Sequence, residues 1–311
     1  MSPDPELDDA GRRELDVRVG FGLLASEVEL ESLLSIVRRV DVARGQLLHT
    51  RGQPVASLFQ VVAGRVELQA PDAPLWHVED GGAVGLLDFA LGRSHARTAT
   101  AAAPSQLLEL DAADYRDYLE DNYEVGHRIL SQLSNRITAA MIASRDSTLF
   151  ATSDLTHQER SFGDVEIPLV ERLIILSRMP VFRGTSMQAL AKLAQNAVER
   201  RYSVGDVITE AGTSPDVVSL LVEGTVELVL PNGRARREGR HLVAHLEELA
   251  TGPRSITASA ATDTIVLQLE REDLIDRIEE HFDLCMTLLA YVAGEQIRVN
   301  NASSDGRCRV A

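Results

Sequence analysis

Arg254 stands out among the residues that could do chemistry. The stretch HLEELATGPRSITASA, residues 245–260, passes from a short helix-prone run through a Gly-Pro-Arg-Ser turn into the alternating small residues of a strand. An arginine guanidinium can pair with an anion, and the free N–H groups at a helix start also favour negative charge. The segment therefore either binds a phosphate-bearing ligand or keeps only the frame of such a site.

An internal repeat supplies the elements that would position this arginine. Residues 45–68, GQLLHTRGQPVASLFQVVAGRVEL, align without a gap with residues 205–228, GDVITEAGTSPDVVSLLVEGTVEL. The glycines of the two copies coincide: Gly45 with Gly205, Gly52 with Gly212, and Gly64 with Gly224. Because glycine allows turns with positive φ, the shared spacing predicts short strands joined by equivalent turns. The simpler alternative is a pair of unrelated β-hairpins.

The similarity extends over a whole domain. Residues 97–122 parallel residues 254–281, with small alternating residues, an apolar strand and an acidic helix start in each. Asp114 and Asp273 stand where a helix N-terminus benefits from a negative side chain. Each copy is therefore expected to be rich in β-structure and closed by helices.

These features resemble the cyclic nucleotide-binding domain, the β-roll shared by the catabolite activator family and the regulatory subunit of cyclic-AMP-dependent protein kinase. The resemblance rests on the glycine-spaced strands, the G-x-V-E-L strand, and an Arg-Ser or Arg-Thr pair followed by alternating alanines and a terminal helix. It covers residues from about 22 to 148 and from about 170 to 298. It implies an α+β fold of two tandem cyclic-nucleotide-binding-type β-rolls, jelly-roll-like double-stranded β-helices, each flanked by helices, with a long central helix.

The domain boundaries follow from this resemblance and from a polar stretch that contains glycine and ends in proline, LFATSDLTHQERSFGDVEIP. We predict a flexible acidic tail over residues 1–20, a first domain with a long C-terminal helix over 21–148, a linker over 149–168, a second domain over 169–299 and a flexible tail over 300–311.

The resemblance also implies a phosphate-binding cassette of the form Phe-Gly-Glu, a short helix and Pro-Arg-Ala or Pro-Arg-Ser. In that motif the arginine pairs with the cyclic phosphate and the glutamate accepts the ribose 2′-hydroxyl. In the first repeat leucine replaces the glutamate, and in the second repeat alanine and histidine replace the Gly-Glu pair. The candidate ligand-binding residues are Gly85, Leu86, Arg97 and Thr98 in the first cassette and Ala244, His245, Arg254 and Ser255 in the second.

Loss of both glutamates should weaken binding of a cyclic nucleotide. A ribose hydroxyl buried against Leu86 would leave its donor unpaired, at a cost of about 1–3 kcal/mol, and would lose a charge-assisted bond of about 1.5–3 kcal/mol. Neutral His245 could still accept that hydrogen bond. However, Glu247 and Glu248 add two negative charges to the helix that should cradle a phosphate. Three alternatives stay open: nucleotide binding, arginines bonded to nearby carbonyls, or binding of a different small anion.

A heptad pattern marks the helix between the repeats. Two adjacent seams recur every seven residues: Leu119, Gly126, Leu133 and Ala140 in the first, and Tyr123, Leu130, Ile137 and Ser144 in the second. The pattern indicates a homodimer through the helix around residues 115–148. In the alternative, the same stripe packs on the β-roll of its own chain.

Other sequence signals argue against catalysis, metal binding and nucleic-acid binding. No Walker loop, G-x-S-x-G elbow or kinase signature occurs. His241 and His245 could ligate a metal only if their segment were helical, so we expect no metal. The formal net charge of -16 repels nucleic acid and anionic membranes. Only NNASSDGRCRVA follows the last predicted helix, so we expect no helix-turn-helix and no sequence-specific DNA binding.

The chain is expected to be cytoplasmic. It has no 18-residue apolar run and no apolar core of a signal peptide near its start. Its two cysteines, Cys285 and Cys308, lack the spacing of a disulfide framework or a CxxC motif.

Two functional hypotheses remain. The first is a non-enzymatic regulatory or scaffold protein, without a cofactor, whose two degenerate domains present surfaces to protein partners. The alternative is a genuine receptor that binds cyclic AMP or cyclic GMP and signals to a separate effector.

Overall fold

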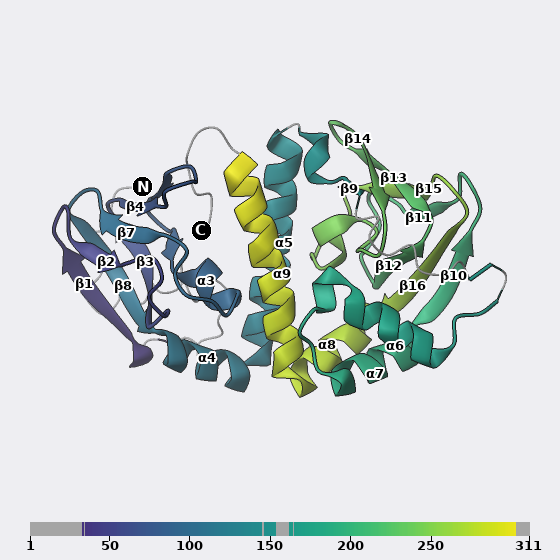
Figure 1. Ribbon diagram of the computed structural model, residues 1–311, viewed down its shortest axis with the longest axis horizontal. Helices are drawn as coiled ribbons and strands as arrows, with labels where there is room; N and C mark the ends of the chain where they lie inside the picture. Colours follow the sequence, from purple (N-terminus) through teal and green to yellow (C-terminus); the bar gives the residue numbers. More distant parts are fainter. Residues whose placement is uncertain (1–32, 34, 145, 154–161, 164, 303–311) are drawn as a thin grey trace. The chain divides into compact units, whose positions relative to one another are not determined.

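The computed structural model describes residues 33, 35–144, 146–153, 162–163 and 165–302 (Figure 1). The predicted tail over 1–20, the start of the first domain, most of the linker, Cys308 and the tail beyond residue 302 lie outside the described residues. By internal contacts the chain divides into a first unit, residues 1–125 with 296–311, and a second unit, residues 126–295. This division differs from the predicted one, because most of the helix assigned to the end of the first domain belongs to the second unit.

The first unit contains a β-roll of two four-stranded sheets. One sheet has the order β1-β8-β3-β6 and the other has the order β2-β7-β4-β5, with antiparallel pairing throughout. A short helix, α3, precedes β7, and a second helix, α4, follows β8. The elements are β1 Val37–Val42, β2 Leu47–His49, β3 Ser57–Ala63, β4 Val66–Gln69, β5 Trp76–Val78, β6 Ala83–Val84, α3 Leu86–Ala90, β7 Thr98–Ala101, β8 Ser105–Asp111 and α4 Ala112–Asp121.

The core of this β-roll lies between its two sheets. In β4, Val66 and Leu68 are buried while the residues between and after them are more exposed, as expected for a strand with one face turned to the core. Val61 of one sheet and Trp76 of the other belong to the same buried cluster. Ile297, near the end of the chain's last helix, packs against this cluster.

The second unit repeats this architecture. Its sheets have the orders β10-β16-β12 and β11-β15-β13-β14-β9. An isolated bridge between Leu220 and Leu242 takes the place of β6. The elements are α5 Tyr123–Ser144, η1 Ser147–Leu149, β9 Thr152–Ser153, α6 Leu169–Arg178, η3 Pro180–Phe182, α7 Met187–Asn196, β10 Val198–Tyr202, β11 Val207–Thr209, β12 Val217–Glu223, β13 Thr225–Leu230, β14 Gly233–Glu238, η4 His245–Glu248, β15 Thr257–Ala260, β16 Thr264–Glu270, α8 Arg271–Glu280 and α9 Phe282–Ala302.

The glycine turns of the two repeats are equivalent, as the sequence predicts. Gly64 has φ of 112° and Gly224 has φ of 96°, a region that side chains of L-residues rarely adopt. A Cβ atom on Gly224 would also lie 2.5 Å from the Asp263 carbonyl oxygen. Glycine is therefore required at this turn both by its backbone angle and by the space available.

The two heptad seams of this region differ in burial. Leu130 and Ile137 of the second seam are each 1% exposed, whereas Leu133 and Ala140 of the first seam are only half-buried. A Cβ atom on Gly126 would lie 2.7 Å from the Sγ atom of Cys285, so α5 and α9 are in close contact within the second unit. The burial of the second seam and of Gly126 favours the alternative in which this helix packs inside the monomer, and a homodimer through the helix stays a prediction.

The start of the predicted linker is structured. Phe150 is fully buried, and β9 pairs in parallel with β14. Among the described residues, no helix is both long and apolar enough to cross a bilayer.

Candidate functional site

The first cassette begins at Gly85, whose backbone conformation only glycine adopts easily. Gly85 has φ of 89° and forms the N-cap of α3. A Cβ atom there would approach the Ser57 carbonyl oxygen to 3.3 Å and the ring of His95 to 3.4 Å. Leu86, which replaces the expected glutamate, is the first residue of α3 and is partly buried.

Arg97 is directed at protein groups. It is 7% exposed and donates hydrogen bonds to the carbonyl oxygens of Pro74 at 2.6 Å and Leu68 at 3.4 Å. Its guanidinium carbon lies 3.7 Å from the centre of the Trp76 ring, a cation–π contact. The hydroxyl of the next residue, Thr98, accepts a hydrogen bond from the Arg51 N–H. This is the arrangement expected for an arginine bonded to nearby carbonyls.

Asp88 places a negative charge inside the first cassette. Its carboxylate accepts hydrogen bonds from Arg93 Nε at 2.8 Å and from the Ala96 N–H at 3.0 Å. These bonds hold the loop that leads to Arg97. The sequence analysis did not single out Asp88, although its position in the short helix between Gly85 and Arg97 was visible.

A pair of stacked histidines lies beside this loop. The rings of His49 and His95 are 3.5 Å apart at their centres and nearly parallel, and Asp88 Oδ2 lies 3.7 Å from His95 Nδ1. The pKa of His49 is lowered to about 4, chiefly by burial and then by the neighbouring His95, against the opposing effects of Asp88 and the Arg97 backbone. Burial also lowers the pKa of His95. Both rings are therefore neutral at pH 7.

The pair should make the protein sensitive to acid. Between about pH 6.5 and pH 4 the unfolded chain binds a proton at His49 and the folded chain does not, so stability falls as the pH is lowered through this window. The full effect of His49 is about 3 kcal/mol. In denaturant unfolding at pH 7 and pH 4.5, we expect His49→Gln to lose less stability on acidification than the unmodified protein. A control outside the stacked pair, His281→Gln at a partly buried position, should lose as much as the unmodified protein, and equal losses in all three would refute the assignment.

In the second cassette, Glu248 takes the place of a bound anion beside Arg254. Its carboxylate is fully buried and lies 3.2 Å from Arg254 Nη2. It also accepts hydrogen bonds from the N–H groups of Ser219 and Ala244. Arg254 donates a further hydrogen bond to the Val217 carbonyl at 2.7 Å. Burial raises the pKa of Glu248, while Arg254 and the two amides oppose that shift.

Glu247 engages the groups that follow Arg254. One carboxylate oxygen accepts from the Ser255 N–H at 2.7 Å and from the Ser255 hydroxyl at 2.6 Å. The other accepts from the Ile256 N–H at 3.1 Å. The arginine and the amides that an anion would use are therefore bonded to two carboxylates of the same short helix, η4.

His245 does not face the cassette arginine. Its Nε2 atom lies 3.0 Å from a carboxylate oxygen of Glu295 in α9, and its ring meets the edge of Phe150. Among the described residues, His245 is the one non-glycine residue with a positive φ, which is 60°. The possibility that His245 accepts a ribose hydroxyl is thus not favoured by its position.

Comparison with models of protein families assigns these two β-rolls to a family. A family model described as cyclic nucleotide-binding domain matches residues 39–122 and 199–281, which together make up more than half of the chain. The chain belongs to the cyclic nucleotide-binding domain family. No curated protein matches it significantly.

Solved structures with tandem and single domains are similar to this chain. The regulatory domain of Toxoplasma gondii PKA with cAMP is 16% identical, with coverage of 93% of this chain and 99% of that chain and a TM-score of 0.34. The regulatory subunit of a cAMP-independent protein kinase A from Trypanosoma brucei is 15% identical, with coverage of 94% and 91% and a TM-score of 0.38. The N-terminal domain of a transcriptional regulator from Streptomyces coelicolor A3(2) is 28% identical, with coverage of 42% and 98% and a TM-score of 0.36.

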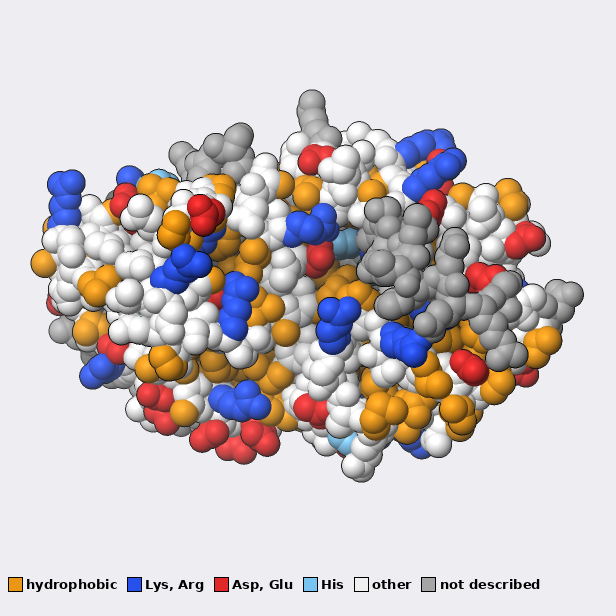
Figure 2. Space-filling model, in the orientation of Figure 1, with side chains coloured by type: hydrophobic (Ala, Val, Ile, Leu, Met, Phe, Trp, Pro, Cys, Tyr) orange, Lys and Arg blue, Asp and Glu red, His pale blue; other side chains and the backbone are white. Residues whose placement is uncertain are grey.

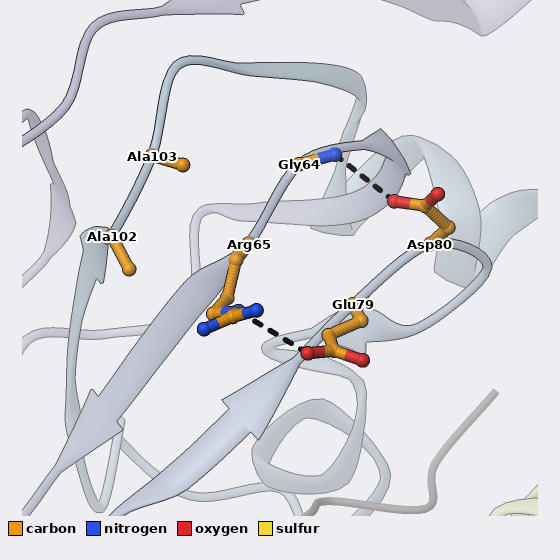
Figure 3. A pocket seen from close by; sticks show the side chains of 6 residues that line it. All are labelled: Gly64, Arg65, Glu79, Asp80, Ala102 and Ala103. Atoms are coloured by element: carbon orange, nitrogen blue, oxygen red, sulfur yellow. Dashed lines mark hydrogen bonds and ion pairs between the residues drawn. The ribbon is translucent and has the colours of Figure 1, made fainter.

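A second hollow of the first cyclic nucleotide-binding domain lies away from the cassette (Figure 3). It has a volume of about 600 Å³ and is lined by Gly64, Arg65, Glu79, Asp80, Ala102 and Ala103. Arg65 pairs with Glu79 at 3.2 Å, and Asp80 accepts from the Gly64 N–H at 3.0 Å. Arg65 and Glu79 are thus paired with each other, and Asp80 is bonded to the backbone.

Proposed function

We propose that this protein is a non-enzymatic regulatory or scaffold protein whose two cyclic nucleotide-binding domains bind cyclic nucleotide weakly or not at all. In this proposal it acts through protein partners. The observation that carries the proposal is the bonding of Glu247 and Glu248 to the second cassette. A cyclic phosphate would have to displace two carboxylates, one of them fully buried, before it reached Arg254.

The first cassette supports the same proposal. Arg97 would have to leave the Pro74 carbonyl and the Trp76 ring before it could pair with a phosphate. Leu86 offers no acceptor for a ribose hydroxyl, and a hydroxyl buried without a partner costs about 1–3 kcal/mol. Asp88, in the helix that should cradle the phosphate, would repel it.

Exposed hydrophobic side chains support action through a protein partner. Leu169 and Val170 of α6 are 48% and 67% exposed, and Met187 of α7 is 56% exposed. Figure 2 shows hydrophobic side chains gathered over the region where Figure 1 draws these two helices. Gathered apolar side chains on a protein surface commonly mark a site of protein association.

Titration with cyclic AMP and cyclic GMP tests the proposal. At 1 mM nucleotide we expect no appreciable rise in melting temperature, because a Kd near or above 1 mM adds at most about 0.4 kcal/mol. Calorimetry on the same samples measures Kd directly. Leu86→Glu, which restores an acceptor in the first cassette, serves as the comparison and should bind more tightly than the unmodified protein.

The receptor alternative predicts the opposite result. It draws on a cavity of about 200 Å³ in the first domain, whose lining includes Gly85, Asp88 and Arg97. A Kd of 10 µM would add about 2.7 kcal/mol at 1 mM ligand, a shift that is easily measured. Such a shift in the unmodified protein would replace the proposed function with that of a cyclic nucleotide receptor.

A further inference from the structure

The short segment that follows α5 lies against the second β-roll. Its strand β9 extends one sheet of this roll by parallel pairing with β14, opposite Arg237 and Glu238 (Figure 1). We call residues 147–153, from η1 to β9, the strap. The strap, β14 and the cassette helix η4 all belong to the second unit, so the contacts among them are contacts within one compact body.

Phe150 is the most deeply buried residue of the strap. It is fully buried, and its ring meets the ring of His245 edge-on, with the ring centres 5.8 Å apart. Its carbonyl oxygen accepts a hydrogen bond from Nη1 of Arg237 at 2.6 Å. Arg237 is only 1% exposed, and a buried guanidinium is costly unless it is hydrogen-bonded. The strap therefore occupies a seat, formed by the edge of β14, Arg237 and His245.

A difference between the two repeats explains why the second roll has such a seat. In the first roll Leu68 pairs with Trp76 across the sheet, whereas in the second roll the repeat counterpart of Leu68, Leu228, pairs with Ala235. Both Trp76 and Ala235 are buried, so the second roll has a methyl group where the first has an indole ring. The strap supplies the second roll with an aromatic side chain, Phe150, that its own strand lacks.

The backbone pairing of the strap is short. β9 has two residues, against the five or six that are usual for a strand, and parallel pairs are slightly less stable per residue than antiparallel pairs. The turn η1 is capped by Asp146, whose carboxylate accepts from the N–H and the hydroxyl of Thr148. Attachment of the strap to the roll thus depends mainly on the buried side chains of Leu149 and Phe150 and on the Arg237 bond.

The seat also holds a strained residue. His245 has φ of 60°, a left-handed conformation that costs free energy for a residue with a side chain and that persists only where its surroundings impose it. One contact of its ring is with Phe150, and its Nε2 atom lies 3.0 Å from a carboxylate oxygen of Glu295. Strain of this kind is concentrated at switch regions, and here departure of the strap would remove one of the contacts that impose it.

We propose that the strap is a releasable intramolecular ligand, and that the seat it leaves binds an extended segment of a protein partner with one aromatic side chain followed by small uncharged residues. The chemistry of this partner is that of the strap itself, Phe-Ala-Thr-Ser. The aromatic ring meets His245, its backbone carbonyl accepts from Arg237, and the small residues pair along the edge of β14. The inference rests on the proposed function and deepens it, because it names the chemistry of the partner.

A peptide with the sequence of residues 146–153, DSTLFATS, tests the seat. Fluorescence anisotropy of the peptide with fluorescein at its N-terminus measures Kd for the full chain. For Phe150→Ala, in which the tethered strap loses its ring, we expect a Kd of about 10–100 µM. The unmodified chain should bind the peptide about 10- to 100-fold more weakly, because its seat is open in about 1–10% of the molecules.

Matched controls assign the binding to the seat. A peptide with alanine in place of the phenylalanine should bind Phe150→Ala at least about tenfold more weakly, since it buries no ring. Phe182→Ala removes another buried phenylalanine of the second unit, outside the strap, and should bind the peptide no better than the unmodified chain. Phe150→Leu keeps an apolar side chain and should bind with intermediate affinity, which tests the seat even if Phe150→Ala does not fold.

Four results would overturn the inference. The first is no binding of the peptide to Phe150→Ala or Phe150→Leu that is folded by circular dichroism. The second is equal affinity for the peptides with and without phenylalanine, and the third is equal affinity of Phe182→Ala and Phe150→Ala. The fourth is no binding by the unmodified chain at 1 mM protein, which would make the strap a permanent part of the core. Binding of cyclic AMP refutes the proposed function, whereas failure of the peptide refutes only this inference.

Discussion

Replacing Glu248 with alanine is expected to lower the free energy of unfolding by about 3–5 kcal/mol, the usual cost of breaking a buried ion pair from one side. Arg254 is 5% exposed and would remain buried with the Val217 carbonyl, but no carboxylate of Glu248, as an acceptor. The N–H groups of Ser219 and Ala244 would also lose the carboxylate that they share. Urea unfolding followed by far-UV circular dichroism measures the loss.

Two control variants identify the cause of the expected loss of stability. One removes the charge and keeps the side-chain shape, and the other breaks an exposed ion pair. Glu248→Gln keeps an acceptor of similar shape and should cost less than Glu248→Ala. Glu227→Ala removes the partner of Arg234, whose side chain is 67% exposed, and should change stability by at most about 1 kcal/mol. Trp76 lies in the first unit, whereas Glu248 lies in the second. Unfolding followed by Trp76 fluorescence should therefore shift less in Glu248→Ala than unfolding followed by circular dichroism. If Glu248→Ala were as stable as Glu227→Ala, Glu248 would not be the counter-charge of Arg254.

The sequence carried enough information for the fold because the fold depends on local rules that are repeated. Gly64 and Gly224 are needed where the backbone takes positive φ, so their shared spacing predicts shared turns. Alternation along strands such as β4 predicts which face meets the core. The two cassette arginines could also be singled out in the sequence, because a helix start followed by arginine is a short-range pattern.

The contacts made by the candidate site residues could not be predicted from such local sequence rules. The charges of Glu247 and Glu248 were visible in the sequence. That their carboxylates bind Ser255 and Arg254, which follow the helix, depends on the path of η4 and of the loop after it. His49 and Trp76 are 27 residues apart in sequence (76 − 49 = 27) and come together only because β2 and β5 belong to the same sheet. The α5 stripe was compatible with two kinds of packing, since a heptad pattern does not say which surface covers it.

Replacing Glu247 with alanine is expected to destabilise the protein by about 2–4 kcal/mol and to create a site for inorganic phosphate. The carboxylate of Glu247 accepts three hydrogen bonds, from the Ser255 N–H and hydroxyl and from the Ile256 N–H. Hydrogen bonds to a charged group contribute about 1.5–3 kcal/mol each, and bonds that share one acceptor group are not additive. Alanine would leave these three donors without their acceptor, the Ile256 N–H at a buried residue and the two Ser255 donors at an exposed one.

Added phosphate should therefore rescue Glu247→Ala and have little effect on the unmodified protein, in which Glu247 already occupies these donors. At 20 mM phosphate, a Kd of about 1 mM would restore about 1.8 kcal/mol, and thermal unfolding at constant ionic strength would detect it. Glu247→Gln retains one acceptor oxygen and should respond less, while sodium chloride at matched ionic strength controls for general salt effects. A phosphate shift of equal size in the unmodified protein would show that the donors after Arg254 are accessible despite Glu247. Rescue confined to Glu247→Ala would instead identify the carboxylate as the group that keeps external anions out of the second cassette.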